Sequence, residues 1–367
     1  MIIDRLEFFR AEMPLKTPFK TAANDIYVVD TLLVKLTSGD TVGWGETTPG
    51  FMPTYSPEST AGALLTAVDY LAPLVKGRGV ESGEELQQLM SPVKGNPFAK
   101  AGIDLAWWDC FARMANEPLY RVLGGLRDEV EVGADFGVKG SVDALLQAIG
   151  QAVEQGYRRV KLKFRPGWDL DMLAAVRIAY PDLTLHVDCN SAYSLADREM
   201  LKKLDGFGLA MIEQPLHSDD LIDHAALRRE LATPICLDES INSPERARKA
   251  LQIGACDWIN IKPGRVGGLT GALAINQLCA ERGVSCWIGG MLESSVGASH
   301  CLALAALPNI SYPSDIFPTD RFFAQDLVGR PMTLSGPAKM TLPDAPGIGF
   351  LPDEAALAQF TLDYQAV

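Results

Sequence analysis

The sequence predicts an α/β fold in which a parallel β/α barrel follows an α+β unit at the N-terminal end. Three observations support this prediction. Residues 1–125 show strand patterns followed by helical patterns, whereas short apolar runs alternate with helical patterns from residue 129 onward. Lys163, Asp188, Glu213, Asp238 and Lys262 each end an apolar run, at successive intervals of 25, 25, 25 and 24 residues. That interval fits one strand plus one helix, the repeating unit of a parallel barrel.

The N-terminal unit is expected to begin as an antiparallel meander. Apolar and β-branched residues that precede turn residues predict three strands, at residues 1–14, 27–36 and 41–45. Two segments beside these strands, residues 15–24 and 47–55, are typical of mobile loops with apolar tips.

Three helices are expected after the meander. The first is capped by Ser56, which precedes a proline, and covers residues 61–75. The second opens at Ser82, with Glu85 at the spacing of a capping box. The third covers residues 98–123 and has the apolar composition of a largely buried helix.

Residues 126–325 are expected to form the barrel. Its eight strands are predicted at residues 130–136, 159–164, 183–188, 209–213, 234–238, 257–262, 285–290 and 310–312. Between them lie helical segments such as residues 141–154 and the helix that Ser243 caps. Residues 326–367 are rich in proline, and this irregular tail is expected to pack back on the N-terminal unit.

Composition limits the class of protein. Of the 367 residues, 47% are apolar, which is enough for a substantial core. No apolar run reaches the roughly 18 residues of a membrane span, and the start of the chain does not resemble a signal peptide, so we expect a cytoplasmic protein. A net charge of −13 without a basic block argues against nucleic acid as a partner. Seven scattered cysteines favour buried, reduced thiols.

Three carboxylates recur at strand ends: Asp188, Glu213 and Asp238. The active site of such a barrel lies at the C-terminal strand ends, so these side chains are expected to converge. A bound divalent cation would remove the cost of their repulsion and desolvation. Oxygen ligands without matching His or Cys favour a hard ion such as Mg²⁺. In the alternative interpretation, the three residues are strand-end caps or ion-pair partners.

Two lysines at strand ends, Lys163 and Lys262, lie on either side of this trio in the strand order. They would therefore face a bound substrate from opposite sides. Beside a metal and other cations, a lysine has a lowered pKa and can accept a proton at neutral pH. Lys161 points the same way as Lys163 by strand alternation and is expected to tune it. Structural ion pairs are the alternative for all three lysines.

Together these groups predict a reaction type. The metal would chelate a substrate carboxylate, and a lysine would remove the proton on the carbon α to it. The positive charge would stabilise the resulting enolate, which otherwise forms too slowly. The expected partner is a small-molecule carboxylate.

Five motifs resemble the muconate-lactonizing-enzyme subgroup of the enolase superfamily. They are Lys161-Leu-Lys163, Asp188-Cys-Asn190, Glu213-Gln-Pro215, Asp238-Glu-Ser240 and the segment 262–268. The resemblance implies a (β/α)7β-type TIM barrel with an N-terminal α+β capping domain, whose loops 15–24 and 47–55 cover the barrel mouth. It also implies a site of defined roles: Mg²⁺ (Mn²⁺ is possible) on Asp188, Glu213 and Asp238, acid/base lysines Lys163 and Lys262, and supporting groups Asn190 and Glu239.

Within the subgroup, residues 96–101, 289–294 and 313–315 with 320–322 most resemble the o-succinylbenzoate synthases and N-acylamino acid racemases. Those families usually continue Glu-Ser with Gly, whereas this chain has Ser295, so the substrate pocket is expected to differ. Asp315-Ile-Phe317 replaces the Asp-x-Asp pair of dipeptide epimerases and disfavours that activity. The residues expected to shape specificity are Phe19, Phe51, Met52, Tyr55, Glu293, Ser294 and Ser295.

Several functions stay open at this point. The same lysines would serve dehydration to o-succinylbenzoate, racemisation of an N-acylamino acid, a muconate-type cycloisomerisation or another acid epimerisation. A barrel that binds phosphorylated ligands at Gly289-Gly290, with structural carboxylates, and a catalytically silent binding protein are alternatives of a different class. The chain is expected to form a homo-oligomer.

Overall fold

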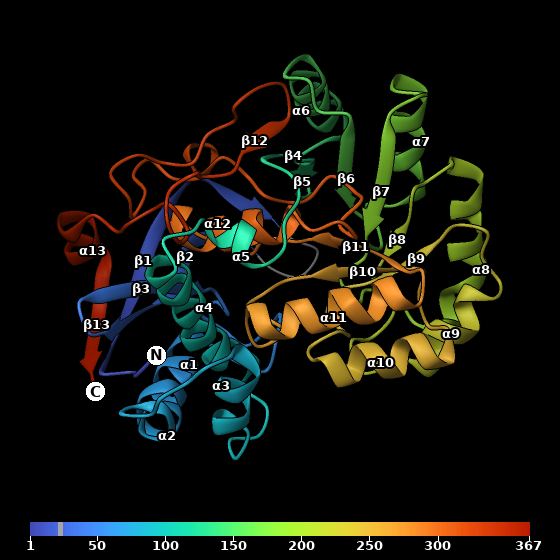
Figure 1. Cartoon of the computed structure of the whole chain (residues 1–367). Helices are drawn as coiled ribbons and strands as arrows, with labels where there is room; N and C mark the ends of the chain where they lie inside the picture. Colours follow the sequence, from blue (N-terminus) through green and yellow to red (C-terminus); the bar gives the residue numbers. More distant parts are fainter. Residues whose placement is uncertain (21–24) are drawn as a thin grey trace.

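The computed structural model describes residues 1–20 and 25–367, which form an antiparallel sheet with its helices beside a parallel barrel (Figure 1). The antiparallel sheet has the strand order β13-β1-β2-β3. Its strands are β1 (Arg5–Lys20), β2 (Asp25–Ser38), β3 (Thr41–Thr47) and β13 (Thr361–Ala366). The predicted meander is therefore present, and the C-terminal end of the chain adds a fourth strand beside β1.

The first predicted loop is shorter than expected. Residues 15–20 belong to β1, and Phe19 pairs with Ile26 of β2 across the sheet. Aromatic and β-branched residues favour such cross-strand pairs, which explains why the strand continues. The rest of the predicted loop, residues 21–24, lies outside the described residues.

The helices of the N-terminal unit bury one face against the sheet. They are α1 (Thr60–Thr66), a π-helical stretch η1 (Ala67–Leu71), α2 (Ala72–Val75), α3 (Gly83–Met90), α4 (Pro97–Met114) and α5 (Leu119–Val122). Ser82 caps α3 as predicted, but α1 is capped by Ser59 rather than Ser56. The single helix predicted at 98–123 is two helices, because Asn116 adopts a left-handed φ of 53° and Pro118 follows.

Seven parallel strands form the barrel sheet, in the order β11-β10-β9-β8-β7-β6-β5. They are β5 (Ala134–Phe136), β6 (Arg159–Lys163), β7 (Thr184–Asp188), β8 (Ile212–Glu213), β9 (Ile235–Leu237), β10 (Trp258–Ile261) and β11 (Ser285–Ile288). In place of an eighth strand, residues 310–315 make isolated bridges to Cys286 and Gly289 on one side and to Val132 on the other. Pro313 lacks an N–H group, so a regular ladder cannot form there.

The predicted first barrel strand is also divided. Residues 129–131 form β4 (Glu129–Glu131), which pairs with β12 (Lys339–Thr341) outside the barrel. The break falls at Gly133, where a Cβ atom would lie 1.9 Å from Cζ of Arg159. The chain bends at this glycine because the guanidinium of Arg159 occupies the space beside it.

Helices and short 3-10 turns connect the barrel strands, and a last helix, α13 (Glu354–Phe360), packs on β1 of the N-terminal sheet (Figure 1). The other helices are α6 (Val142–Glu154), α7 (Leu170–Ala179), α8 (Arg198–Leu201), α9 (Ile222–Arg228), α10 (Pro244–Ile253), α11 (Leu269–Glu281) and α12 (Ser295–Ala305). The 3-10 turns are η2 (Leu195–Asp197), η3 (Lys202–Phe207) and η4 (Thr319–Arg321). Ser141 and Ser243 cap α6 and α10 as the sequence predicts.

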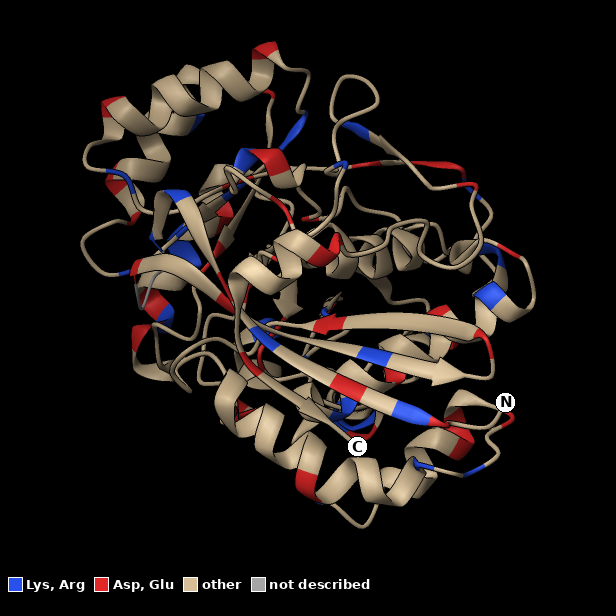
Figure 2. Cartoon of the chain, turned by 90° about the vertical axis from the view of Figure 1, so that its left-hand side faces the viewer, with Lys and Arg blue, Asp and Glu red and all other residues tan. Residues whose placement is uncertain are grey.

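Charge and apolar residues are distributed as expected for such a protein. Lys and Arg alternate with Asp and Glu along the elements that face the viewer in Figure 2. All seven cysteines are buried and free. No helix among residues 1–20 and 25–367 is long and apolar enough to cross a membrane.

Candidate active site

A cavity of about 590 Å³ lies over the C-terminal ends of the barrel strands. The strand register explains why charged residues gather there, since Lys163, Asp188 and Glu213 are direct neighbours on β6, β7 and β8. Asp238 and Lys262 follow the ends of β9 and β10. The five residues of the sequence pattern are all buried; Lys163 and Lys262 line this cavity, and the three carboxylates lie behind them, where Asp188 and Asp238 contact the two lysines.

The three carboxylates are surrounded by donors on most sides. Asp188 accepts a hydrogen bond from Nζ of Lys163 at 2.7 Å, and Asp238 accepts one from Nζ of Lys262 at 3.0 Å. Glu213 accepts at Oε1 from Nδ2 of Asn260 at 2.7 Å. Its Oε2 is buried without a hydrogen-bond partner among the described residues.

These residues fit a hard divalent cation by chemistry and by place. Burial and the charge of Asp188 raise the pKa of Glu213 well above its ordinary value, a strain that a cation would relieve. In the described part of the chain, however, no three acidic, His or Cys side chains yet surround a common point. The cause is visible in the contacts above, because Asp188 and Asp238 turn toward their lysines.

The two lysines differ from expectation in their pKa. Burial lowers the pKa of Lys163, but the charges of Asp135 and Asp188 outweigh burial and raise it. The pKa of Lys262 is likewise raised, because Asp238 outweighs burial. The sequence predicted lowered values, which require the carboxylate charges to be compensated. The neighbouring carboxylates thus favour the ammonium form of both lysines.

Lys161 lies at the centre of a buried ion network. Its Nζ is 2.6 Å from Oδ2 of Asp315 and 3.5 Å from Oε2 of Glu213. Asp315 also pairs with Nη1 of Arg159 at 2.6 Å. Lys161 thus stands beside Lys163 as predicted, and its charge lowers the pKa of that neighbour against the stronger effect of the carboxylates.

Asn190 and Glu239 lie next to the carboxylates. The Asn190 side chain donates to Oε1 of Glu239 at 3.1 Å and to Oδ2 of Asp188 at 3.3 Å. Burial and the charge of Asp238 raise the pKa of Glu239 to about 8. Both residues line the cavity, so each can reach a ligand as well as the carboxylates.

Sequence reasoning missed Arg265 and Asp135. Arg265 forms a close ion pair with Asp238 and donates to the hydroxyl of Tyr55 at 2.6 Å. The sequence feature that could have indicated it is the segment 262–268, in which Arg265 is the only cationic residue besides Lys262. Asp135 is a cavity residue on the short strand β5, and its signal was a charged residue inside an apolar run.

The predicted specificity residues divide into two groups. Phe19, Phe51, Met52 and Tyr55 line the cavity from the N-terminal unit. The hydroxyl of Tyr55 lies 3.1 Å from Nζ of Lys262, which brings the segment 47–55 into contact with the barrel site.

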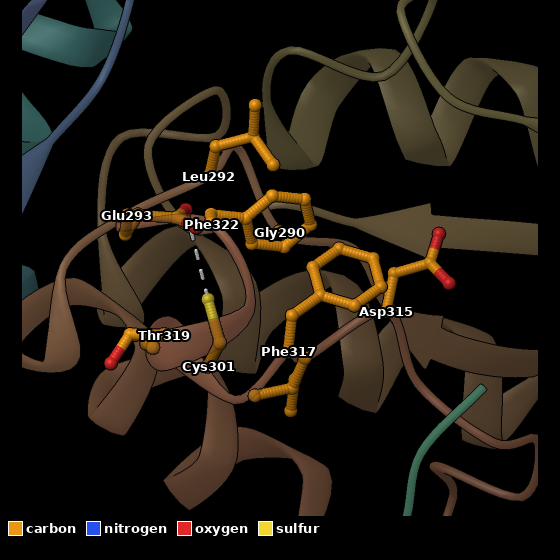
Figure 3. Close-up of a pocket in the computed structure, with 10 residues that line it drawn as sticks. Gly290, Leu292, Glu293, Cys301, Asp315, Phe317, Thr319 and Phe322 are labelled. Atoms are coloured by element: carbon orange, nitrogen blue, oxygen red, sulfur yellow. Dashed lines mark hydrogen bonds between the residues drawn. The ribbon is translucent and has the colours of Figure 1, made fainter. Parts of the chain in front are cut away.

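The strand-seven group is placed differently from the prediction. Ser294 and Ser295 are fully buried and do not line the cavity, because their hydroxyls donate to Glu46 and Asp326 at 2.5 and 2.6 Å. Glu293 lines a separate, much smaller cavity beside the main one, where it points toward Cys301 (Figure 3). Asp315 lies at the other side of this small cavity. Only Gly290, Met291 and Leu292 of this segment reach the main cavity.

Comparisons with known proteins agree with this architecture. Residues 5–124 match the family "Mandelate racemase / muconate lactonizing enzyme, N-terminal domain", and residues 144–356 match "Enolase C-terminal domain-like". An o-succinylbenzoate synthase of Geobacillus kaustophilus is 44% identical over 95% of this chain and 93% of its own length. An N-succinylamino acid racemase of Thermus thermophilus is 42% identical over 95% and 94%.

A solved structure extends the similarity to the whole fold. It is the crystal structure of an enolase-superfamily member from Listeria innocua, with a TM-score of 0.96. The two chains are 39% identical, and the similarity covers 100% of this chain and 99% of the other. The chain fold described above is therefore that of the superfamily, including the barrel closed by residues 310–315.

Proposed function

This chain belongs to the mandelate racemase / muconate lactonizing enzyme family and is an enzyme of the enolase superfamily. From this membership and the site described above, we propose the following reaction. The enzyme removes the proton α to the carboxylate of a small-molecule substrate, as an o-succinylbenzoate synthase, an N-acylamino acid racemase or both. One observation carries this proposal. Lys163 and Lys262, two buried lysines that line the cavity, donate to Asp188 and Asp238, whose strands lie on either side of the Glu213 strand.

The cation of this reaction would be held by Asp188, Glu213 and Asp238. When bound there, Mg²⁺ or Mn²⁺ would supply positive charge that stabilises an enolate and would release the lysines from these carboxylates. Asn190 and Glu239 would keep Asp188 oriented through their shared hydrogen bonds. Lys161, held by Asp315, would keep a fixed positive charge next to Lys163.

Both lysines take part in either branch, but only racemisation uses both of them for proton transfer. In racemisation, the neutral amine of one lysine takes the α-proton, and the ammonium of the other donates a proton to the opposite face. In dehydration, one lysine takes the α-proton, and hydroxide leaves the neighbouring carbon while the other lysine stays charged. The names of the two relatives correspond to these two branches.

The cavity suits a substrate of this class. Its volume, about 590 Å³, falls within the range of sites for small molecules. Phe19, Phe51 and Met52 give its entrance an apolar wall, whereas the floor carries the charged groups. A substrate with a carboxylate at one end and an apolar body fits this division.

The alternative of a phosphate-binding barrel has a specific argument against it. A Cβ atom at Gly289 would lie 2.4 Å from Oδ1 of Asn260 and 2.8 Å from Cε of Lys262. The glycine is therefore required by the close approach of the site residues, and a phosphate need not be invoked to explain it.

Proton exchange in deuterated buffer tests the proposal. The enzyme with Mg²⁺ should exchange the α-proton of both enantiomers of an N-succinylamino acid; a chelator should abolish the exchange of both, and Lys163→Ala should abolish that of one. Lys76→Ala, which removes an exposed lysine of the N-terminal unit, is the matched control and should exchange normally. The dehydration precursor of o-succinylbenzoate, measured in parallel, assigns the branch. Absence of exchange across a broad panel of carboxylates would refute the proposal.

A further inference from the structure

Asp135 is a buried carboxylate at the cavity wall that the proton-transfer scheme does not use. It is 6% exposed and lines the main cavity near the end of β5. Its Oδ1 is buried and, within residues 1–20 and 25–367, has no hydrogen-bond partner. An unpaired buried acceptor of this kind is costly unless something donates to it.

The position of Asp135 is fixed by its surroundings. It lies directly opposite Lys161 in the register of β5 and β6, so both side chains point to the same side of the sheet. Its backbone oxygen accepts a hydrogen bond from Nη2 of Arg321 at 3.2 Å. These contacts fix the backbone of Asp135, and the strand register directs its side chain to the same side of the sheet as Lys161.

The other carboxylate oxygen, Oδ2, forms two long ion pairs with the lysines. Oδ2 lies 3.7 Å from Nζ of Lys161 and 3.9 Å from Nζ of Lys163. Because Oδ2 is so close to Lys163, Oδ1 is within reach of atoms attached to a carbon that Lys163 deprotonates. Asp135 therefore stands beside the reacting centre and has one oxygen free for a ligand.

The negative charge of Asp135 opposes the reaction unless a group of the substrate donates a hydrogen bond to it. It holds Lys163 in the ammonium form and disfavours negative charge that develops on the substrate. A substrate group that donates a hydrogen bond to Oδ1 would offset both effects. A carboxylate at this position can accept a hydrogen bond but offers no proton to a departing hydroxide.

We propose that Asp135 is a specificity-determining residue that accepts a hydrogen bond from an amide N–H next to the reacting carbon of the substrate. The inference rests on the proposed function and narrows it to N-acylamino acids, favouring racemisation over dehydration. A neutral amide is favoured over an ammonium group because an amide N–H needs one acceptor, which Oδ1 provides, whereas an ammonium group has three hydrogens to donate. Asp315, another acid that lines the cavity, is already paired with Arg159 and Lys161.

A pair of substrates that differ only in the N–H group tests the assignment. One is an N-acylamino acid, and the other is its ester analogue, in which oxygen replaces the N–H. The α-proton exchange of both is measured as kcat/KM with the wild-type enzyme and with Asp135→Ala. The amide-to-ester ratio should fall roughly 10- to 100-fold in the variant, the range for a hydrogen bond to a charged acceptor. Intrinsic differences in acidity between the substrates cancel in this comparison of ratios.

Asp135→Asn separates an amide from an ammonium ligand. It retains an acceptor oxygen but loses the charge, so it should keep most of the preference for the amide substrate. Two results together would overturn the amide assignment. Asp135→Asn would lose the preference for the amide substrate over the ester as fully as Asp135→Ala does, and only the wild type would exchange the α-proton of a dipeptide with a free amino group. Thermal melting of each variant shows whether it is folded.

The failures of the two proposals are distinguishable. If wild type and a folded Asp135→Ala exchange both substrates with the same amide-to-ester ratio, the role of Asp135 is refuted while the proposed function stands. If the wild type exchanges neither substrate, the proposed function fails and the Asp135 assignment fails with it. If the ester is exchanged faster by Asp135→Ala than by the wild type, the opposing charge of Asp135 is demonstrated directly.

Discussion

The carboxylate of Glu46 on β3 accepts hydrogen bonds from both the backbone N–H and the hydroxyl of Ser294, at 3.0 and 2.5 Å. Glu46 also accepts from the N–H of Gly297 at 2.8 Å, so it caps the first turn of α12 from another part of the chain. The segment just before this turn, Gly290 to Leu292, forms a wall of the main cavity. The N-terminal sheet is thereby tied to the wall of the site.

Loss of Glu46 should affect both stability and substrate binding. Glu46→Ala leaves buried donors unpaired at Ser294 and Gly297, and we expect a loss of about 3 kcal/mol in the free energy of unfolding. The loosened cavity wall should also raise KM several-fold. Ser294→Ala, which removes one donor, should cost about 1 kcal/mol. Urea unfolding and steady-state kinetics measure the two effects, and unchanged kinetics in a destabilised Glu46→Ala would show that this contact does not position the wall.

The two lysines should serve opposite faces of the substrate. Lys163 and Lys262 contact carboxylates on opposite sides of Glu213, so each should act on one enantiomer of a chiral substrate. We expect Lys163→Ala and Lys262→Ala each to reduce exchange at least about 100-fold for a different enantiomer. Exchange of separate enantiomers in deuterated buffer, followed by NMR, checks this. Equal loss for both enantiomers in both variants would argue against a two-base arrangement.

Much of the barrel could be predicted because a polar residue marks the end of each central strand. The fixed interval from Lys163 to Lys262 identified these ends. The register of β6, β7 and β8 then makes their last residues direct neighbours across the sheet. The division of the first predicted strand could not be seen, because it depends on Arg159 occupying the space beside Gly133. That contact joins adjacent strands and leaves no periodic trace in the sequence.

The limits of prediction at the site have a similar cause. Ser294 and Ser295 carry hydroxyls next to a cavity-lining segment, and only distant partners decide that these hydroxyls turn away. Glu46 is 248 positions from Ser294, and Asp326 is 31 positions from Ser295. Asp135 escaped notice because it falls outside the 25-residue interval. Side chains whose role depends on such long-range neighbours cannot be assigned from a local pattern.

A divalent cation should stabilise the fold through Glu213. At a Mg²⁺ concentration of about 100 times Kd, binding adds about 2.7 kcal/mol to the free energy of unfolding, which should raise Tm by several degrees. Glu213→Gln should abolish this rise. In chelator the same variant should be at least as stable as the wild type, because glutamine can never carry a charge next to Asp188. Asp143→Asn, at an exposed acid of α6, is the control and should keep the Mg²⁺ response. A full response in Glu213→Gln would place the cation elsewhere.

The stability of the protein should fall as pH rises from about 4.5 toward 7 because of Glu293. Burial raises the pKa of its side chain from 4.5 to about 7 in the folded state. Between these values the folded state binds the proton and the unfolded state does not, so the contribution is fully present below about pH 4.5 and is lost as the pH approaches 7. We expect the free energy of unfolding to decrease by roughly 1–3 kcal/mol across this window because of this residue.

Glu293→Gln, which cannot titrate, should have a flatter profile of stability against pH in urea unfolding measured between pH 5 and about 8. Parallel profiles for the wild type and Glu293→Gln would show that another buried acid, such as Asp104, with a pKa raised by burial to about 6, dominates the pH dependence.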